Sequence, residues 1–330
     1  MTNTRPRVLA TWHFPDDGLQ LLTDTCDLTV WAGDHPMSGE ELQRGIAVMH
    51  GLFCSPATDR IDAALLQRAA HLRVVSNFGV GYDNVDVPAA TSRGIWVCNT
   101  PGVLTDAVAD QTFALLLAVA RRVSEAERLV HDGQWRHWHP TLLVGKSVGG
   151  ASLGVVGMGG IGSAVARRAA GFGMRIRYTS RERKSAVEAA TGAQQVSLDT
   201  LLHESDYVSL HTALTPATRH LIGDEEFRRM RPSAVLINTA RGGVVDQAAL
   251  TRALLEGRIA GAGLDVTDPE PISMDDPLLG LANCVIVPHI GSATVEARAR
   301  MSVLACENLL AVLQGRRPRY AVNEGELRAV

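Results

Sequence analysis

Short apolar segments alternate with longer amphipathic segments along almost the whole chain. Continuous apolar runs are typical of strands buried on both faces, whereas the longer periodic segments are typical of helices. The predicted strands form two series, at residues 7–11, 28–31, 47–54, 72–76 and 95–98, and at 152–156, 175–179, 207–210, 234–238, 261–266 and 284–288. Helices are predicted between strands of the first series at 38–44, 62–70 and 87–93. This alternation predicts an α/β fold with parallel sheets.

A long helical pattern separates the two series of strands. Thr105 can cap its N-terminus, and the pattern continues to a stop near Gly133, so we predict one helix that bridges two domains. Residues 294–313 form another helical pattern, which ends at Gly315. A chain of 330 residues is also long enough to form two domains.

The composition is that of a soluble globular protein, with 46% hydrophobic and 20% charged residues. A net charge of −3 provides no broad positive field that would attract nucleic acid or anionic lipid. The N-terminus lacks an apolar signal core, and no run of about 18 apolar residues predicts a membrane span. Five dispersed cysteines favour reduced thiols over a disulfide framework. These features predict a cytoplasmic protein with no nucleic-acid or membrane partner.

A glycine-rich segment, Gly157–Gly162, follows a predicted strand and precedes a helical pattern. Its glycines fill the G-x-G-x-x-G motif: the first permits a tight turn, the second lets the backbone approach a diphosphate, and the third lets helix and strand pack closely. We predict that the segment binds a dinucleotide at the helix N-terminus, the alternative being a purely structural turn. The predicted contacts are Gly157, Met158, Gly159, Gly160, Ile161 and Gly162.

The residues after the next strand bear on which dinucleotide binds. NAD-binding units usually carry an acidic residue there, which accepts from the ribose 2′-hydroxyl, but this chain has Ser180 followed by Arg181. A small hydroxyl beside a guanidinium suits a 2′-phosphate, so we predict a preference for NADP(H), with NAD(H) also usable. Arg183 and Lys184 would add positive charge. In the alternative, these basic residues stay in solvent and Glu182 binds the ribose.

Three polar segments after strands of the second series carry the groups that hydride transfer to a 2-oxo acid requires. Loops at the carboxyl ends of parallel strands are the usual ligand sites of such sheets. Arg241 can bind the carboxylate and the carbonyl, and His289 can donate a proton to the carbonyl oxygen. Glu270 can hold the other ring nitrogen and favour the charged imidazolium. Each also has a structural alternative: a surface turn, a loop histidine and a solvated carboxylate.

Several segments in the same order resemble the D-isomer-specific 2-hydroxyacid dehydrogenases over almost the whole chain. They are NFGVGYDNVD at 77–86, NTP at 99–101, the glycine segment at 157–162, NTARGGVVDQAAL at 238–250, GLDVTDPEP at 263–271 and VPHIGSAT at 287–294. Because several motifs match in order, the resemblance is far more specific than any one of them.

The resemblance implies a set of site residues. The catalytic residues would be Arg241, Glu270 and His289. Backbone N–H groups of Val80 and Gly81 would hold the substrate carboxylate. The other substrate-binding residues would be Arg241, His289, Ser292 and Trp138. Further cofactor contacts would come from Thr105, Ala213, Thr239, Asp265 and Gly291.

The resemblance also implies the architecture. The family has two Rossmann-like, doubly wound parallel-sheet domains with the active site in the cleft between them, and its members are usually homodimers. We therefore expect a discontinuous substrate-binding domain at 1–101 and 290–330, and a dinucleotide-binding domain at 102–289.

Within the family, the chain is most similar to glyoxylate/hydroxypyruvate reductases. The similarity rests on LDVTDPEP, HIGSAT, the YTSR stretch at 178–181 and the two tryptophans of 135–138. In those enzymes a tryptophan of the partner subunit reaches the substrate pocket. That role is assigned here to Trp138, a plain dimer anchor being the alternative.

A small histidine cluster, His131, His137 and His139, lies near the predicted dimer contact. Zinc would need such ligands, but we predict loop histidines and no metal site.

These observations predict an oxidoreductase that transfers a hydride between NAD(P)H and a small 2-oxo or 2-hydroxy acid, most simply glyoxylate or hydroxypyruvate. Other substrates of the family, such as lactate, phosphoglycerate or phosphite, are the alternatives within the enzyme class. Outside it, the same fold serves dinucleotide-sensing scaffolds and corepressors. The absence of added tails beyond the fold argues against a scaffold.

Overall fold

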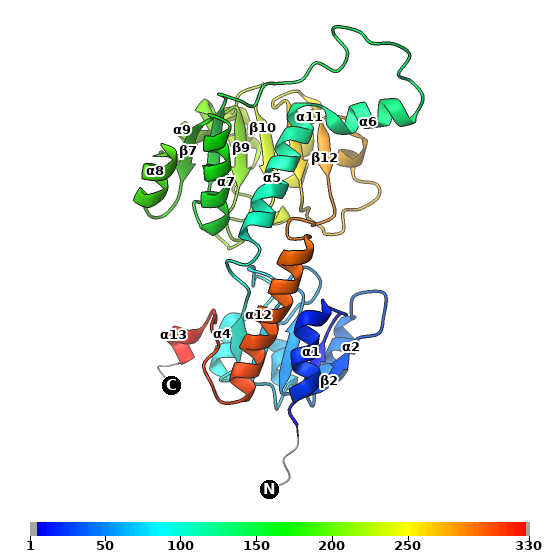
Figure 1. Cartoon of the computed structure of the whole chain (residues 1–330), viewed down its shortest axis with the longest axis vertical. Helices are drawn as coiled ribbons and strands as arrows, with labels where there is room; N and C mark the ends of the chain where they lie inside the picture. Colours follow the sequence, from blue (N-terminus) through cyan, green and yellow to red (C-terminus); the bar gives the residue numbers. More distant parts are fainter. Residues whose placement is uncertain (1–4, 328–330) are drawn as a thin grey trace. The chain divides into compact units, whose positions relative to one another are not determined.

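The computed structural model describes residues 5–327, which form two compact units. The first unit extends to Leu104 and resumes at Ala293, and the second comprises Thr105–Ser292. Each has a parallel β-sheet covered by helices on both faces, so the predicted α/β class is confirmed (Figure 1). No helix within residues 5–327 combines the length and apolarity that crossing a membrane requires.

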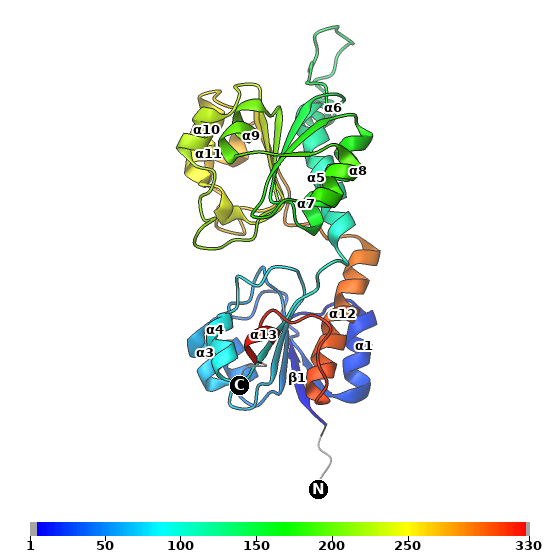
Figure 2. The same ribbon diagram turned by 90° about the vertical axis from the view of Figure 1, so that its left-hand side faces the viewer.

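The first unit contains five parallel strands in the order β2-β1-β3-β4-β5. The strands are β1 (Arg7–Ala10), β2 (Asp27–Val30), β3 (Gly51–Cys54), β4 (Val74–Asn77) and β5 (Trp96–Cys98). The helices are α1 (Asp16–Thr25), α2 (Gly39–Ile46), α3 (Ala63–Arg68), α4 (Val87–Ser92), α12 (Val295–Leu313) and α13 (Glu324–Leu327). Figure 2 shows α1 and α12 side by side on one face of the sheet, with α3 and α4 on the other.

Helix α12 returns the chain to the first unit. Thr294 caps it, since its hydroxyl accepts from Ala297 N at 3.1 Å. Arg73 donates to the carbonyls of residues 312 and 313 at 2.8 and 2.9 Å, and Ser76 Oγ donates to Ala305 O at 2.8 Å. These bonds attach α12 to β4 and to the residue before it.

The second unit contains seven parallel strands in the order β12-β11-β10-β9-β6-β7-β8. The strands are β6 (Ser152–Val156), β7 (Arg175–Thr179), β8 (Gln194–Gln195), β9 (Tyr207–Leu210), β10 (Val235–Asn238), β11 (Gly261–Leu264) and β12 (Cys284–Ile286). The helices are α5 (Thr105–Ala120), α6 (Val123–His131), α7 (Gly160–Gly171), α8 (Ser185–Thr191), α9 (Leu198–Glu204), α10 (Asp224–Arg229) and α11 (Gln247–Leu255). Short 3-10 turns lie at Gly242–Val244 and Pro277–Gly280.

Both faces of this second sheet are buried, which explains the continuous apolar runs in the sequence. Successive strand residues point to opposite faces. Val155 belongs to the core packed by α5 and α7, whereas Val156 belongs to the core packed by α9, α10 and α11. Figure 2 shows these two helical layers on opposite sides of the sheet.

Three expectations about local structure are wrong. The predicted strand 47–54 begins only at Gly51, because residues 47–50 form the turn that follows α2. The long helix is interrupted at Arg122, whose φ of 54° is left-handed, so α5 and α6 are separate helices and both lie in the second unit. Thr105 is the first residue of α5 rather than its cap.

Candidate active site

The glycine loop joins β6 to the N-terminus of α7. Gly157 has a φ of +96°, and a Cβ there would lie 2.7 Å from His211 O. A Cβ at Gly162 would lie 2.1 Å from Gly157 O, so helix and strand approach too closely for any side chain. A Cβ at Gly159 would meet no atom within 4 Å. The first and third glycines are therefore required by the fold, whereas the second faces open space.

This loop fits a dinucleotide diphosphate. The first N–H groups of α7 have no acceptor within the helix, and Gly159, its N-cap, provides no side-chain acceptor. The open space at Gly159 admits an anion close to the backbone. Thr105, an expected contact, lies beside the loop, since its Oγ1 is 3.7 Å from the position of a Cβ on Gly160. Met158, the residue between the first two glycines, is buried in the core of the second unit.

The segment after β7 contains the residues expected at the adenosine ribose. Ser180 Oγ donates to Glu182 O, and Ser180 O accepts from Gln195 Nε2 at 2.9 Å. Arg183 pairs with Glu188 at 2.8 Å. Lys184 and Glu182 form an ion pair at 3.1 Å. Arg181 is exposed and, within residues 5–327, forms no ion pair or hydrogen bond, so it is the uncommitted cation of this segment.

The loop that carries Arg241 follows β10 and is shaped by Asn238. The Asn238 side chain accepts from Ala240 N at 3.0 Å and donates to Arg241 O at 2.9 Å. Arg241 is half-buried, and its Nη1 donates to Ala240 O at 2.9 Å. A Cβ on Gly242 would lie only 1.9 Å from Thr267 O. This glycine therefore lets the Arg241 loop pack directly against the segment that leads to Glu270.

His289 and Glu270 lie in contact at the carboxyl edge of the sheet. β10, β11 and β12 are adjacent strands, so the loops that follow them are neighbours. His289 Nδ1 shares a hydrogen bond with Glu270 Oε1, and both side chains remain about 30% exposed. Nε2 of His289 makes no hydrogen bond with any residue in the described part of the chain. The pair thus presents one ring nitrogen to a ligand while a carboxylate orients the other.

Asp265 fixes the loop that carries His289, a role that the sequence did not reveal. Its carboxylate, 2% exposed, accepts from Ile290 N at 2.8 Å and from Gly291 N at 2.9 Å, and its backbone O accepts from His289 N at 2.9 Å. Burial raises the pKa of Asp265, and the hydrogen bond from Ile290 and the charge of His289 oppose that rise. These bonds hold His289 at its left-handed φ of 52°.

The remaining expected cofactor contacts also lie at the carboxyl edge of the second sheet. Thr239 is buried after β10, and its hydroxyl shares a hydrogen bond of 2.9 Å with Thr112 of α5. Ala213 follows β9, and its carbonyl accepts from Thr218 Oγ1 at 2.6 Å. Gly291 is packed so closely on Asp265 that a Cβ would lie 2.7 Å from the carboxylate.

Two of the expected substrate-binding residues belong to the first unit. Val80 and Gly81 lie in a half-exposed turn after β4, and their N–H groups donate to no residue within 5–327. Ser292, the last residue of the second unit, is also half-exposed.

The histidines at 131, 137 and 139 share no common contact within residues 5–327. His131 pairs with Glu127 at 3.2 Å, His139 Nδ1 bonds Thr141 Oγ1 at 2.9 Å, and all three histidines are exposed. Among the described residues, no group of three or more histidine, cysteine or acidic side chains could hold a metal ion.

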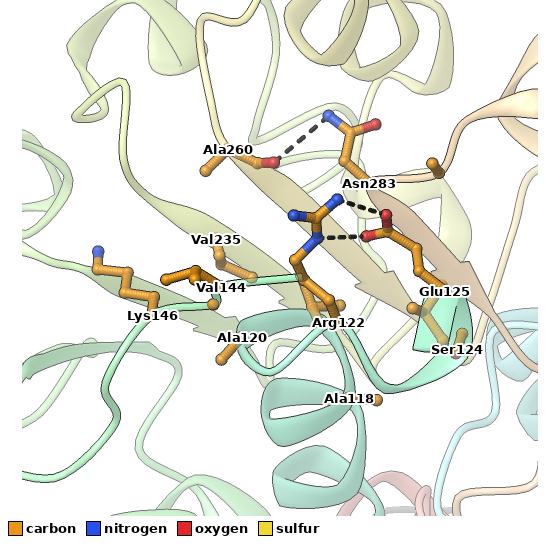
Figure 3. A pocket seen from close by; sticks show the side chains of 14 residues that line it. Ala118, Ala120, Arg122, Ser124, Glu125, Val144, Lys146, Val235, Ala260 and Asn283 are labelled. Atoms are coloured by element: carbon orange, nitrogen blue, oxygen red, sulfur yellow. Dashed lines mark hydrogen bonds and ion pairs between the residues drawn. The ribbon is translucent and has the colours of Figure 1, made fainter. Parts of the chain in front are cut away.

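A hollow of about 460 Å³ lies at the opposite, amino edge of the second sheet (Figure 3). Val235 begins β10, and Ala260 and Asn283 directly precede β11 and β12. Figure 3 shows Arg122 paired beside them with Glu125, at an Nη2–Oε2 distance of 2.7 Å. None of the expected catalytic or cofactor-binding residues lines this hollow, so it is distinct from the candidate active site.

Comparison with known proteins agrees with this arrangement. Residues 113–291 match the family described as D-isomer specific 2-hydroxyacid dehydrogenase, NAD binding domain. The chain is 50% identical over 321 residues to a glyoxylate reductase of Korarchaeum cryptofilum, covering 97% of this chain and 96% of that protein. It is 47% identical over 328 residues to a glyoxylate reductase of Thermococcus litoralis, covering 98% of each.

Solved structures show the same fold. A protein from Thermus thermophilus superposes with a TM-score of 0.88 at 48% identity, covering 96% of this chain and 99% of that one. An NADPH-dependent glyoxylate/hydroxypyruvate reductase from Sinorhizobium meliloti, solved with NADP and malonate, gives 0.85 at 33% identity and covers 97% of each chain. With the glycine loop and the contact between Glu270 and His289 on adjacent strand ends, these matches show that the chain belongs to the D-isomer-specific 2-hydroxyacid dehydrogenases.

Proposed function

We propose that this protein reduces glyoxylate and hydroxypyruvate to glycolate and D-glycerate with NADPH. The observation that carries the proposal is the His289–Glu270 pair, which offers Nε2 to a ligand at the same sheet edge as the glycine loop. The names of the similar proteins, glyoxylate reductases and a glyoxylate/hydroxypyruvate reductase, support the substrate class. Neither these names nor the described residues favour lactate, phosphoglycerate or a scaffold role over this one.

The residues divide the chemistry between them. When bound, the nicotinamide supplies a hydride to the carbonyl carbon of the 2-oxo acid. His289 donates a proton from Nε2 to the carbonyl oxygen, which becomes the hydroxyl, and Glu270 stabilises the positively charged ring before transfer. Arg241 attracts the negative charge of the substrate. The N–H groups of Val80 and Gly81 hold its carboxylate.

The function is tested by following NADPH and NADH oxidation by absorbance with glyoxylate, hydroxypyruvate, pyruvate and phenylpyruvate. We expect the largest kcat/KM with glyoxylate or hydroxypyruvate, and a D-configured product from hydroxypyruvate. A preference for pyruvate or phenylpyruvate would reassign the substrate within the family, and no turnover with any of the four would contradict the enzymatic proposal.

The Glu270→Gln variant should lower kcat for glyoxylate reduction. The amide keeps the size of the side chain but removes the negative charge beside Nδ1, so His289 loses the carboxylate that orients its ring. The measurement is kcat at saturating NADPH, with NADPH binding followed by fluorescence as the control. A variant with an unchanged kcat would show that Glu270 does not act through His289.

We also propose that the protein is a cytoplasmic homodimer. The segment from α6 to Lys146 exposes apolar side chains that a second copy would cover, and Figure 1 shows the part after α6 extending away from its own unit. The exposed side chains are Val123, Val130, Trp135, Trp138, Leu142 and Val144, between 41% and 76% accessible. All five cysteines are buried, unpaired thiols, which supports a reducing compartment.

Trp138, at 76% exposure, separates the two roles proposed for this segment. If it reaches the substrate pocket of a partner, Trp138→Ala should raise KM for hydroxypyruvate while light scattering still reports a dimer. If it is only an anchor, the variant should dissociate to monomers. Trp31, whose Nε1 donates to His35 O at 2.9 Å within the first unit, offers a control at which Trp31→Ala should change neither the mass nor KM.

A further inference from the structure

The three successive backbone carbonyls of the turn at residues 79–81 each accept a hydrogen bond from another residue of the first unit. Gly79 O accepts from Thr100 N at 2.9 Å, Val80 O accepts from Asn99 Nδ2 at 2.8 Å, and Gly81 O accepts from Asn77 Nδ2 at 3.1 Å. The N–H groups of these three residues meet no acceptor within residues 5–327. The turn therefore presents backbone N–H donors, and the hydrogen bonds to its carbonyls fix the direction in which those donors point.

A pair of asparagines closes this turn. Asn77 ends β4, and Asn84 follows seven residues later, after the turn. Asn77 Nδ2 donates to Asn84 Oδ1 at 2.9 Å, and Asn84 Nδ2 donates back to Asn77 Oδ1 at 3.2 Å. We call this reciprocal pair the amide clamp. It ties together the two ends of the segment that contains the donors.

The surroundings of the clamp fix its orientation. Asn77 is fully buried, and its Oδ1 also accepts from Cys54 Sγ at 3.0 Å. Asn84 Nδ2 reaches the backbone O of Asp59 at 2.9 Å. Every polar atom of the Asn77 amide therefore has a partner, and neither amide can rotate by half a turn without setting donors against donors.

We propose that the Asn77–Asn84 amide clamp is a positioning device that aims the N–H groups of Val80 and Gly81 at the carboxylate of the substrate. The clamp touches neither substrate nor cofactor; it acts by holding Gly81 O and both ends of the turn. This inference rests on the proposed function, in which that turn receives a 2-oxo acid. The inference assigns a role in substrate affinity to the buried amide of Asn77 and the half-buried amide of Asn84.

The clamp predicts a specific kinetic pattern. A carboxylate is held equally before and during hydride transfer, so misaligned donors should raise KM and leave kcat nearly unchanged. Each charge-assisted hydrogen bond contributes roughly tenfold or more in affinity. We expect Asn84→Ala to raise KM for glyoxylate and the dissociation constant of oxalate together by about tenfold, with kcat within about threefold of wild type.

Two variants test the clamp with different side effects. Asn77→Asp keeps the acceptor for Cys54 but cannot donate to Gly81 O, and it introduces charge. Asn84→Ala introduces no charge and decides the question alone if the first variant does not fold. Oxalate binding is measured by calorimetry on enzyme saturated with NADP, and NADPH binding by fluorescence. Both variants should weaken oxalate binding and leave NADPH binding unchanged.

Asn323 provides the matched control. It is a 1% exposed asparagine of the same unit, bonded to Ile95 O at 2.9 Å, to Thr91 Oγ1 at 2.9 Å and from Val97 N at 3.0 Å. Asn323→Ala should lower the melting temperature and leave oxalate binding unchanged. If it weakens oxalate binding as much as Asn84→Ala does, general destabilisation explains the effect and the proposal is overturned.

The possible outcomes separate the clamp from the function on which it rests. Folded clamp variants that bind oxalate within about twofold of wild type overturn the clamp, even when the wild type reduces glyoxylate. A wild type that reduces no 2-oxo acid overturns the proposed function. In that case the oxalate titration still decides: selective loss of oxalate binding in the variants supports the clamp, and any other result overturns it.

Discussion

Replacing His289 with glutamine should lower kcat for glyoxylate reduction by about 10²–10⁴-fold and leave the dissociation constant of NADPH nearly unchanged. Glutamine can fill the space of the ring and bond Glu270, but it cannot exchange a proton with the substrate. The measurement combines the single-turnover absorbance change of NADPH with a fluorescence titration of NADPH.

His220 supplies a close control for this substitution. Its φ of 51° nearly equals the 52° of His289, and it lies exposed in the same unit, outside the expected catalytic set. His220→Gln therefore imposes the same change on the same backbone conformation and should retain kcat. Near-normal turnover in His289→Gln, or an equal loss in His220→Gln, would contradict the assignment of His289 as the proton donor.

The second large effect concerns the choice of cofactor. We expect the wild type to prefer NADPH over NADH by at least about tenfold in kcat/KM. Arg181 is exposed and has no ion-pair or hydrogen-bond partner among the described residues, so its guanidinium can bind the 2′-phosphate of NADPH. Ser180→Asp combined with Arg181→Ala should reverse the preference, mainly by weakening NADPH binding. Steady-state kinetics with both cofactors measure the ratio.

Arg183 is the control for this prediction. Its guanidinium pairs with Glu188, so Arg183→Ala should change the cofactor ratio much less than Arg181→Ala does. The opposing hypothesis is that Glu182 leaves its pairing with Lys184 and binds the ribose of NADH. A wild type that prefers NADH, together with a selective loss of NADH use in Glu182→Ala, would establish that hypothesis instead.

The sequence by itself determined the α/β class and most of the elements of the second sheet. β6, β7 and β9 have the predicted bounds. β6 and β9 are buried on both faces, so the apolar run ends where the strand ends, whereas in β7 buried residues alternate with more exposed ones. It also placed Arg241, Glu270 and His289 on loops after three strands. The physical reason is that a parallel α/β unit repeats a local pattern, so the carboxyl ends of its strands can be read in order along the chain.

Local pattern failed where packing or backbone conformation decided the outcome. Residues 47–49 are apolar and resemble the start of a strand, but they form the turn after α2. The helical periodicity around Arg122 continues through a left-handed residue that ends one helix and starts another. Periodicity reports which side chains are buried, and it does not report what kind of element buries them.

Only the tertiary structure decided how the candidate site is oriented. The sequence already suggested the pairing of Glu270 with His289, but the structure alone showed that it uses Nδ1. It alone also showed that Asp265 holds the His289 loop through two backbone N–H groups, and that three backbone carbonyls anchor the turn at 79–81. Each of these contacts joins residues that are distant in sequence or depends on which atom of a side chain faces its partner. Spacing along a chain carries no information about such directions, because they are set by hydrogen-bond geometry in the packed fold.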